Sequence, residues 1–252
     1  MLGWSSEGLL ALLLVSALRG RYLSKYPLFY VYLAGWFFAG LVRFFFFTFH
    51  LGHPNEYSLV YWYTQFLLVA GGYGVLWQIY AHTLDPFPGT AKMARVLVGT
   101  FFVTIVTQLF FKILTGHAEG LSESVLRLDR NLHSIQAGLI VMLISLVWYY
   151  DIPLGRNVRG LLLGHGLLIT TRLITLALQS IFEMSLYAWW YYSEQICILA
   201  SLVVWSIALR SYEPNPIPEH QIRLEQDYEL LAHRTVQALS RARGYLARPF
   251  LP

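Results

Sequence analysis

The stretch "YWYTQFLLVAGGYGVLWQIY", Tyr61 to Tyr80, decides the fold of this 252-residue chain. Its length is about that which an α-helix needs to cross the hydrocarbon of a bilayer, and it contains no charged residue. It also carries two glutamines, four tyrosines and three glycines. One helix would therefore be apolar enough for a membrane and rich in hydrogen-bonding groups, and those groups need partners on neighbouring helices.

The composition of the whole chain agrees with a membrane protein. Hydrophobic residues make up 56% of the sequence and charged residues 13%, and the mean hydropathy is +0.51. Soluble domains have about 25% charged residues, so the chain belongs with polytopic membrane proteins. The net charge of +4 lies mostly in loops and tail, which favours membrane lipids with anionic headgroups as partners and not nucleic acid. Cys197 is the only cysteine, which excludes an intrachain disulfide or CxxC chemistry.

Apolar runs separated by turn and charge signals predict an all-α bundle of seven transmembrane helices. The runs cover residues 2–18, 26–49, 58–82, 94–115, 132–150, 158–182 and 187–209. The first run is the shortest and contains Glu7, so a six-helix bundle remains the alternative. It has no basic region before it, and no cleavable signal peptide is expected. Gly160 and Gly164 have a GxxxG spacing, which predicts the close approach of another helix.

Basic residues predict the orientation of the bundle. One set of loops contains Arg19, Arg21, Lys25, Lys92, Arg95, Arg156 and Arg159, with Arg210 opening the tail. The opposite set contains Arg127 and Arg130, diluted by Glu119, Glu123 and Asp129. Because cytoplasmic loops carry the excess of Lys and Arg, the N-terminus is expected outside and the C-terminus in the cytoplasm of a plasma or inner membrane.

The composition changes after the seven-helix domain, residues 1–210. Residues 211–218 form a proline-rich stretch that reads as a stiff linker. Residues 219–252 return to helical periodicity, with an apolar face made of Leu224, Tyr228, Leu231, Leu239, Ala242 and Leu246. An isolated helix of this length is marginal in water, so we expect the tail to dock on the anionic inner leaflet, on the protein's own loops or on a second copy.

Ionisable residues inside the predicted spans indicate a site, because each one is costly in a membrane and needs a partner. Arg43, Lys112, Arg172 and Glu194 fall in the outer half of their spans. Gln65, Gln108, Gln136, Gln179 and Gln195 lie at comparable depths, which predicts a polar layer shared by several helices. The hairpin that turns near Met184 brings Arg172 within reach of Glu194, which predicts an ion pair.

Two interpretations of this polar layer remain open. The ion pair could be a structural clamp between two helices, and Arg43 and Lys112 could reach the outer headgroups. Alternatively, three cations against one carboxylate leave a positive potential that an anionic ligand group would satisfy. The candidate ligand-binding residues are Arg43, Gln65, Lys112, Gln136, Arg172, Glu194 and Gln195.

Histidines suggest a different kind of site. His82 and His165 fall in the inner half of two spans, and neutral imidazoles on two helices can hold a haem. Neither histidine belongs to a pair of histidines whose spacing recurs on a second helix. A structural role, in which each imidazole is hydrogen-bonded, is the simpler interpretation. Haem or a pigment is therefore the alternative cofactor, with no cofactor assigned.

Enzyme motifs are missing from the sequence. It contains no HExxH, no GxSxG and no paired Asp motif, and no enzymatic activity is expected. No inverted repeat is visible, so a transporter is the less favoured reading. The expected function is a non-catalytic sensory or binding module that takes an apolar or amphipathic, anionic ligand. The alternative is an accessory subunit of a larger membrane complex, binding haem, quinone or pigment, with partner subunits or a homo-oligomer.

Overall fold

The computed structural model describes residues 2–20, 22–49, 54–114, 121–182, 187–216 and 221–247. These residues form eight α-helices and one short 3-10 helix, with no β-strand among them, so the all-α class is confirmed. The elements are α1 (Leu2–Gly20), η1 (Tyr22–Ser24), α2 (Pro27–Phe49), α3 (Pro54–Thr83), α4 (Pro88–Leu114), α5 (Leu121–Tyr149), α6 (Arg156–Phe182), α7 (Tyr187–Ala208) and α8 (Gln221–Ala247).

Two helices begin well before the apolar runs that predicted them. α4 begins at Pro88 and not at residue 94, because proline is well suited to the first position of a helix. α5 begins at Leu121 and not at residue 132. Its first three turns are rich in charged residues. Their low hydropathy predicts a loop, although the backbone is already helical there. The placement of Asp129 in an outer loop is therefore wrong, because this residue lies inside α5.

Three of the described helices contain a segment long and apolar enough to cross a membrane, namely Pro27–Phe49, Asp129–Tyr149 and Arg156–Leu178. A shorter apolar helix covers Tyr192–Ala208. Large hydrophobic side chains point outward from these helices, including Phe38, Phe45, Val141 and Ile174. The protein is thus a helical protein with several helices compatible with a membrane.

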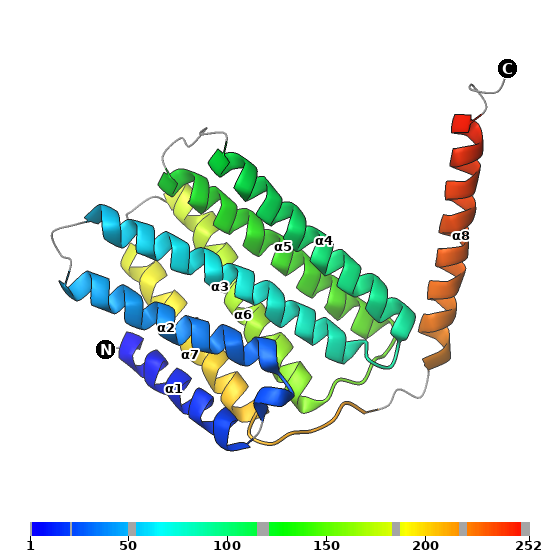
Figure 1. The fold of residues 1–252 in the computed structure, drawn as a ribbon. Coiled ribbons are helices and arrows are strands. Elements are labelled where there is room, and N and C mark those ends of the chain that lie inside the picture. Colours follow the sequence, from blue (N-terminus) through cyan, green and yellow to red (C-terminus); the bar gives the residue numbers. More distant parts are fainter. Residues whose placement is uncertain are drawn as a thin grey trace.

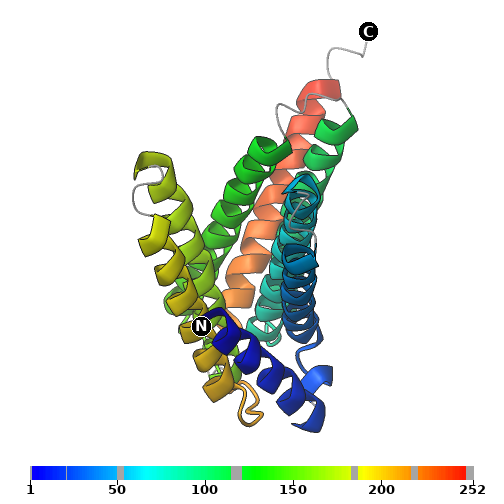
Figure 2. The same cartoon turned by 90° about the vertical axis from the view of Figure 1, so that its left-hand side faces the viewer.

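The bundle is built from two helical hairpins and the helices between and beside them (Figure 1). α2 runs against α3, and α6 runs against α7. α3 also contacts α4, α5 and α6, whereas α1 packs on α2 and α7. We call the end of the bundle that carries residues 84–87, 150–155 and 211–216 the linker end. The two hairpins lie closest together there and diverge toward the opposite end (Figure 2).

The polar groups of the opening stretch, in α3, bind the neighbouring helices. The hydroxyl of Tyr73 donates to the carbonyl of Leu132 at 3.0 Å, and that of Tyr80 donates to the carbonyl of Leu139 at 2.6 Å. The Gln78 side chain accepts from the amide of Phe29 at 2.9 Å, which satisfies one of the free N–H groups in the first turn of α2. These groups hold the half of α3 nearer the linker end to α2 and α5.

Glycines allow α6 and α7 to touch, as the GxxxG spacing predicted. A Cβ on Gly160 would lie 2.0 Å from the Cβ of Ala208, and a Cβ on Gly164 would lie 2.3 Å from Nε1 of Trp205. No side chain larger than hydrogen fits at either position without moving α7. The close approach makes α6 and α7 one stiff pair.

Residues 211–216 are fastened across the linker end. The Asn157 side chain donates to the carbonyls of Ala208 at 2.7 Å and Ser211 at 2.9 Å, and accepts from the amide of Glu213 at 2.6 Å. Asn215 accepts from the amide of Gly155 at 3.0 Å and donates to the carbonyl of His82 at 2.7 Å. This segment therefore follows any movement of α6 relative to α3.

Helix α8 touches the bundle near its beginning and then projects away from it (Figure 1). It contacts α4, and the hydroxyl of Tyr150 donates to a carboxylate oxygen of Asp227 at 3.1 Å. Farther along, Leu230, Leu231 and Val236 are exposed by 51%, 58% and 65%. The side chains of Leu224 and Leu239 lie outside the described residues. Of the predicted apolar face, the structure describes the side chains of Tyr228, which is half-buried, and Leu231, which is exposed.

Candidate functional site

Arg172 of α6 holds together three helices. Its Nη1 donates to Oε1 of Glu194 on α7 at 2.8 Å, which confirms the predicted ion pair. Its Nη2 lies 3.3 Å from Oδ2 of Asp129 on α5. Arg172 is thus shared between two carboxylates, and the clamp that the sequence suggested includes a third helix.

Asp129 joins this cluster although the sequence analysis did not include it among the candidate site residues. Its side chain is 2% exposed, and besides Arg172 it accepts from Nε2 of Gln65 at 3.4 Å and lies 3.3 Å from Nδ1 of His133. The count of three cations against one carboxylate was therefore incomplete. The available signal was the helical spacing of Asp129 and His133, four residues apart, directly before a long apolar run.

Arg43 of α2 completes a continuous line of side chains. Its Nη2 donates to Oε1 of Gln65 at 3.2 Å and to the carbonyl of Tyr61 at 3.3 Å, and its Nε donates to Oγ1 of Thr64 at 2.7 Å. The guanidinium carbon lies 4.4 Å from the centre of the Tyr61 ring. Arg43 therefore turns toward α3 and not out toward headgroups.

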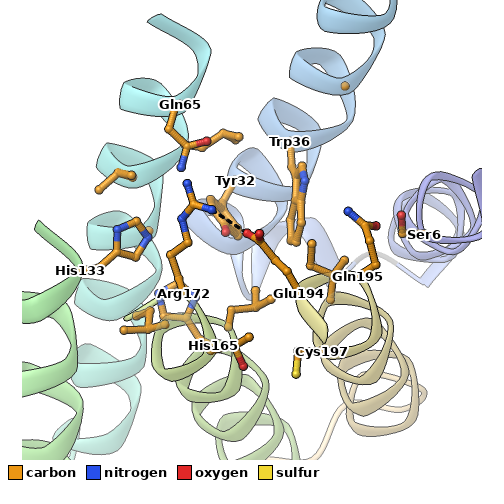
Figure 3. Close-up of a pocket in the computed structure, with 18 of the residues that line it drawn as sticks. Ser6, Tyr32, Trp36, Gln65, His133, His165, Arg172, Glu194, Gln195 and Cys197 are labelled. Carbon is orange, nitrogen blue, oxygen red and sulfur yellow. Dashed lines mark hydrogen bonds and ion pairs between the residues drawn. The ribbon is translucent and has the colours of Figure 1, made fainter. Parts of the chain in front are cut away.

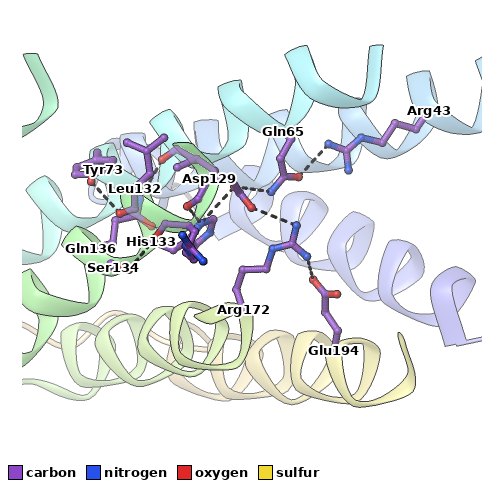
Figure 4. Close-up of polar contacts among 12 residues, drawn as sticks. Arg43, Gln65, Tyr73, Asp129, Leu132, His133, Ser134, Gln136, Arg172 and Glu194 are labelled. Atoms are coloured by element: carbon purple, nitrogen blue, oxygen red, sulfur yellow. Dashed lines mark hydrogen bonds and ion pairs between the residues drawn. The ribbon is translucent and has the colours of Figure 1, made fainter. Parts of the chain in front are cut away.

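We call Arg43, Gln65, Asp129, Arg172 and Glu194 the polar chain (Figure 4). It takes one residue from each of α2, α3, α5, α6 and α7. Four residues of the expected polar layer, Arg43, Gln65, Arg172 and Glu194, thus belong to this chain, and Asp129 is its middle member. Within it, both carboxylates are bound to Arg172, while every described partner of Arg43 is neutral.

The polar chain borders a pocket of about 610 Å³ between the two hairpins (Figure 3). On α3 the pocket extends from the turns farthest from the linker end to the middle of the bundle. Its lining residues are Ser6, Glu7, Tyr32, Trp36, Gly40, Arg43, Tyr57, Tyr61, Trp62, Gln65, Leu68, Val69, Gly72, His133, Gln136, His165, Leu168, Ile169, Thr171, Arg172, Leu176, Glu194, Gln195, Cys197 and Ile198.

Six of the seven candidate ligand-binding residues therefore border one pocket: Arg43, Gln65, Gln136, Arg172, Glu194 and Gln195. Lys112 is the exception. It belongs to α4, which contributes no residue to the described lining, and its side chain lies outside the described residues. The side chains of Gln108 and Gln179 also lie outside them.

The deep end of the pocket contains polar atoms without protein partners. His165 is 2% exposed, its ring stands nearly perpendicular to that of Tyr32, and neither ring nitrogen makes a well-aligned hydrogen bond to a described residue. Nε of Arg172 is likewise buried, with no acceptor among the described residues. Gln136 is held beside them by its donation to the carbonyl of Val69 at 3.1 Å. Such atoms need a hydrogen-bonding group supplied from within the pocket.

The two histidines considered for a haem do not share this pocket. His82 lies at the linker end of α3, where its Nδ1 is 2.9 Å from the carbonyl of Gln78 and its ring lies 4.9 Å from that of Tyr26. Only His165 of the two borders the cavity. No group of three or more His, Cys, Asp or Glu side chains placed to hold a metal occurs among the described residues.

Together these features define a helical protein, compatible with a membrane, that has a partly polar pocket in its bundle. No family model, no curated protein and no solved structure matches the chain. Inferences about its function therefore depend on the pocket itself.

Proposed function

We propose that this chain is a non-catalytic multi-pass membrane protein that binds an amphipathic ligand with an acidic head in this pocket. The observation that carries the proposal is Arg43, a cation that borders the pocket and forms no ion pair with a carboxylate among the described residues; its described hydrogen bonds all go to neutral acceptors. Arg172 has two such partners. An acidic group on the ligand is the partner that Arg43 lacks, because a cation in a low-dielectric region favours a nearby anion.

The shape and walls of the pocket support a long ligand. On α3 the lining extends from Tyr57 to Gly72, and 15 helical residues rise by about 22 Å. The rest of the lining is mixed: it includes the apolar side chains of Leu168, Ile169 and Ile198 as well as polar ones such as Gln136 and Gln195. The apolar part of the lining would bury a hydrocarbon chain, while the convergent polar groups would hold the head.

A binding event could reach the tail through the stiff α6–α7 pair. α6 carries Arg172 and His165 in the pocket and Asn157 at the linker end, and Asn157 binds the segment that leads to α8. A ligand that changes the tilt of this pair would therefore move residues 211–216. This continuity supports a sensory role for the module.

The proposal includes seven membrane spans, α1 to α7, with the N-terminus outside and α8 on the cytoplasmic membrane surface. In a Cys197→Ser background, a cysteine at position 118 should be labelled from outside by a membrane-impermeant maleimide. Cysteines at Asp85 and Val236, both exposed at or beyond the linker end, should be labelled only after permeabilisation. Labelling of Asp85→Cys in intact cells would reverse the orientation.

The ligand is tested with two amphiphiles that share one chain, a fatty acid and the matching fatty alcohol. In maltoside detergent, the wild-type protein should bind the acid about tenfold more tightly than the alcohol, measured by quenching of tryptophan fluorescence. Arg43→Gln should remove this preference, since about tenfold corresponds to about 1.4 kcal/mol of a charge-assisted contact. Arg159→Gln, an exposed cation at the linker end, is the control and should keep the preference. Equal binding of acid and alcohol to the wild-type protein would refute the acidic head.

A second candidate role, an accessory subunit of a larger membrane complex, is supported by exposed apolar side chains of α8. A partner subunit could cover Leu230, Leu231 and Val236 in place of lipid. Native mass spectrometry of the protein purified from its own membrane distinguishes the two roles, because a stoichiometric foreign subunit is expected only for the second.

A further inference from the structure

The first turns of α1 bring a carboxylate into the pocket. A Cβ on Gly40 of α2 would lie 2.4 Å from Oε1 of Glu7, so the Glu7 carboxylate rests directly on the α2 backbone. Oε2 of Glu7 is buried without a hydrogen-bond partner, and no cation pairs with Glu7 among the described residues. An ionised carboxylate in such a place is costly until a cation joins it.

The position of Glu7 on α2 is informative. Trp36, Gly40 and Arg43 are spaced by four and three residues, so they follow one another along one face of that helix, and all three border the pocket. Glu7 therefore lies between an indole ring on one side and an unpaired guanidinium on the other. The rise from Gly40 to Arg43 is about 4.5 Å. Figure 3 shows Trp36 of α2 and Ser6 of α1, the neighbour of Glu7 in the sequence, at the same side of the pocket.

We propose that the ligand's head is zwitterionic, with its ammonium group between Glu7 and Trp36 and its acidic group on Arg43. This inference rests on the proposed function, because it concerns the same ligand in the same pocket. It adds a second charge to the head of the ligand, the ammonium group. It also assigns Glu7 as the residue that binds this group.

The chemistry of the three side chains matches such a head. Carboxylates bind ammonium groups directly, and the face of a tryptophan ring attracts cations, including quaternary ammonium. The rise of about 4.5 Å along α2 from Gly40, where Glu7 rests, to Arg43 suits a head in which the ammonium and the acidic group are a few bonds apart. The zwitterion adds no net charge to the pocket, whereas a simple acid would leave Glu7 unpaired.

The test uses amphiphiles of one chain length with four heads: a lysophosphocholine, a fatty acid, an alkyltrimethylammonium and a fatty alcohol. Phosphocholine without a chain is the fifth probe. Dissociation constants are measured in maltoside detergent by tryptophan quenching. We expect the lysophosphocholine to bind at least about tenfold more tightly than the acid. Glu7→Gln should abolish this advantage, because the ammonium then loses its counter-ion. Glu229→Gln, an exposed carboxylate on α8, should keep it.

The outcomes distinguish the zwitterionic head from the proposed function, the binding of an amphiphile with an acidic head. If Glu7→Gln keeps the full preference for the lysophosphocholine over the acid, or if the wild-type protein has none, the zwitterionic head is wrong. Arg43-dependent binding of the acid would then still support the proposed function. If none of the chain-bearing probes binds, both fail. If phosphocholine alone binds as tightly as the lysophosphocholine, the hydrocarbon chain of the ligand contributes nothing to binding. That result would overturn the proposal of an amphipathic ligand. Thermal unfolding of each variant checks that it is folded.

Discussion

Arg172→Leu is expected to lower the free energy of unfolding by about 3–5 kcal/mol, the range found when one partner of a buried ion pair is removed. The reason is that both Asp129 and Glu194 lose their cation at once. Glu194→Leu should cost less, because Asp129 still neutralises Arg172 and the Glu194 side chain is 30% exposed. Titration from a mild detergent into sodium dodecyl sulfate measures these differences.

A combined variant tests whether Arg172 serves one carboxylate or two. If Glu194 were the sole partner of Arg172, the double variant Arg172→Leu/Glu194→Leu would regain most of the stability lost in Arg172→Leu. The structure predicts little recovery, because Asp129, which is 2% exposed, still lacks Arg172. Adding Asp129→Asn to the double variant should restore a substantial part of the loss. Full recovery without Asp129→Asn, or strictly additive effects, would contradict the three-helix clamp.

Gly160→Ala is expected to lower the free energy of unfolding by about 1–3 kcal/mol, the usual cost of forcing extra volume into a well-packed contact. The added methyl group would lie 2.0 Å from the Cβ of Ala208, so α6 and α7 would have to separate. The separation would also loosen the contact of Gly164 with Trp205, which is fully buried. The same titration in sodium dodecyl sulfate applies.

Gly138→Ala on α5 is the matched control, since nothing lies within 4 Å of the position of its Cβ. Alanine favours a helix over glycine by about 1 kcal/mol, so this variant should be neutral or slightly stabilised. If Gly160→Ala is as stable as Gly138→Ala, the helices adjust without cost and the tight contact is not a constraint. If both lose stability equally, the effect is not due to the α6–α7 contact.

The sequence by itself determined the helical class, since its apolar runs repeat at a length suited to a bilayer. It also determined the Arg172–Glu194 pair and the close approach of α6 and α7. These features are local: the two residues lie on consecutive helices joined by a short turn, so helix geometry alone brings them together. A spacing of four between two glycines likewise describes one face of one helix.

Only the tertiary structure decided the other partners. Asp129 lies 64 residues from Gln65 and 43 residues from Arg172 in the sequence, and these contacts depend on how α3, α5 and α6 are rotated about their own axes. Hydropathy placed Asp129 in a loop, because it averages over neighbours and the first turns of α5 are charged. Glu7 reaches the pocket only because Gly40, on a different helix, leaves room for it. Short-range order follows from the residue pattern, whereas the pairing of distant polar groups follows from packing, which no linear spacing encodes.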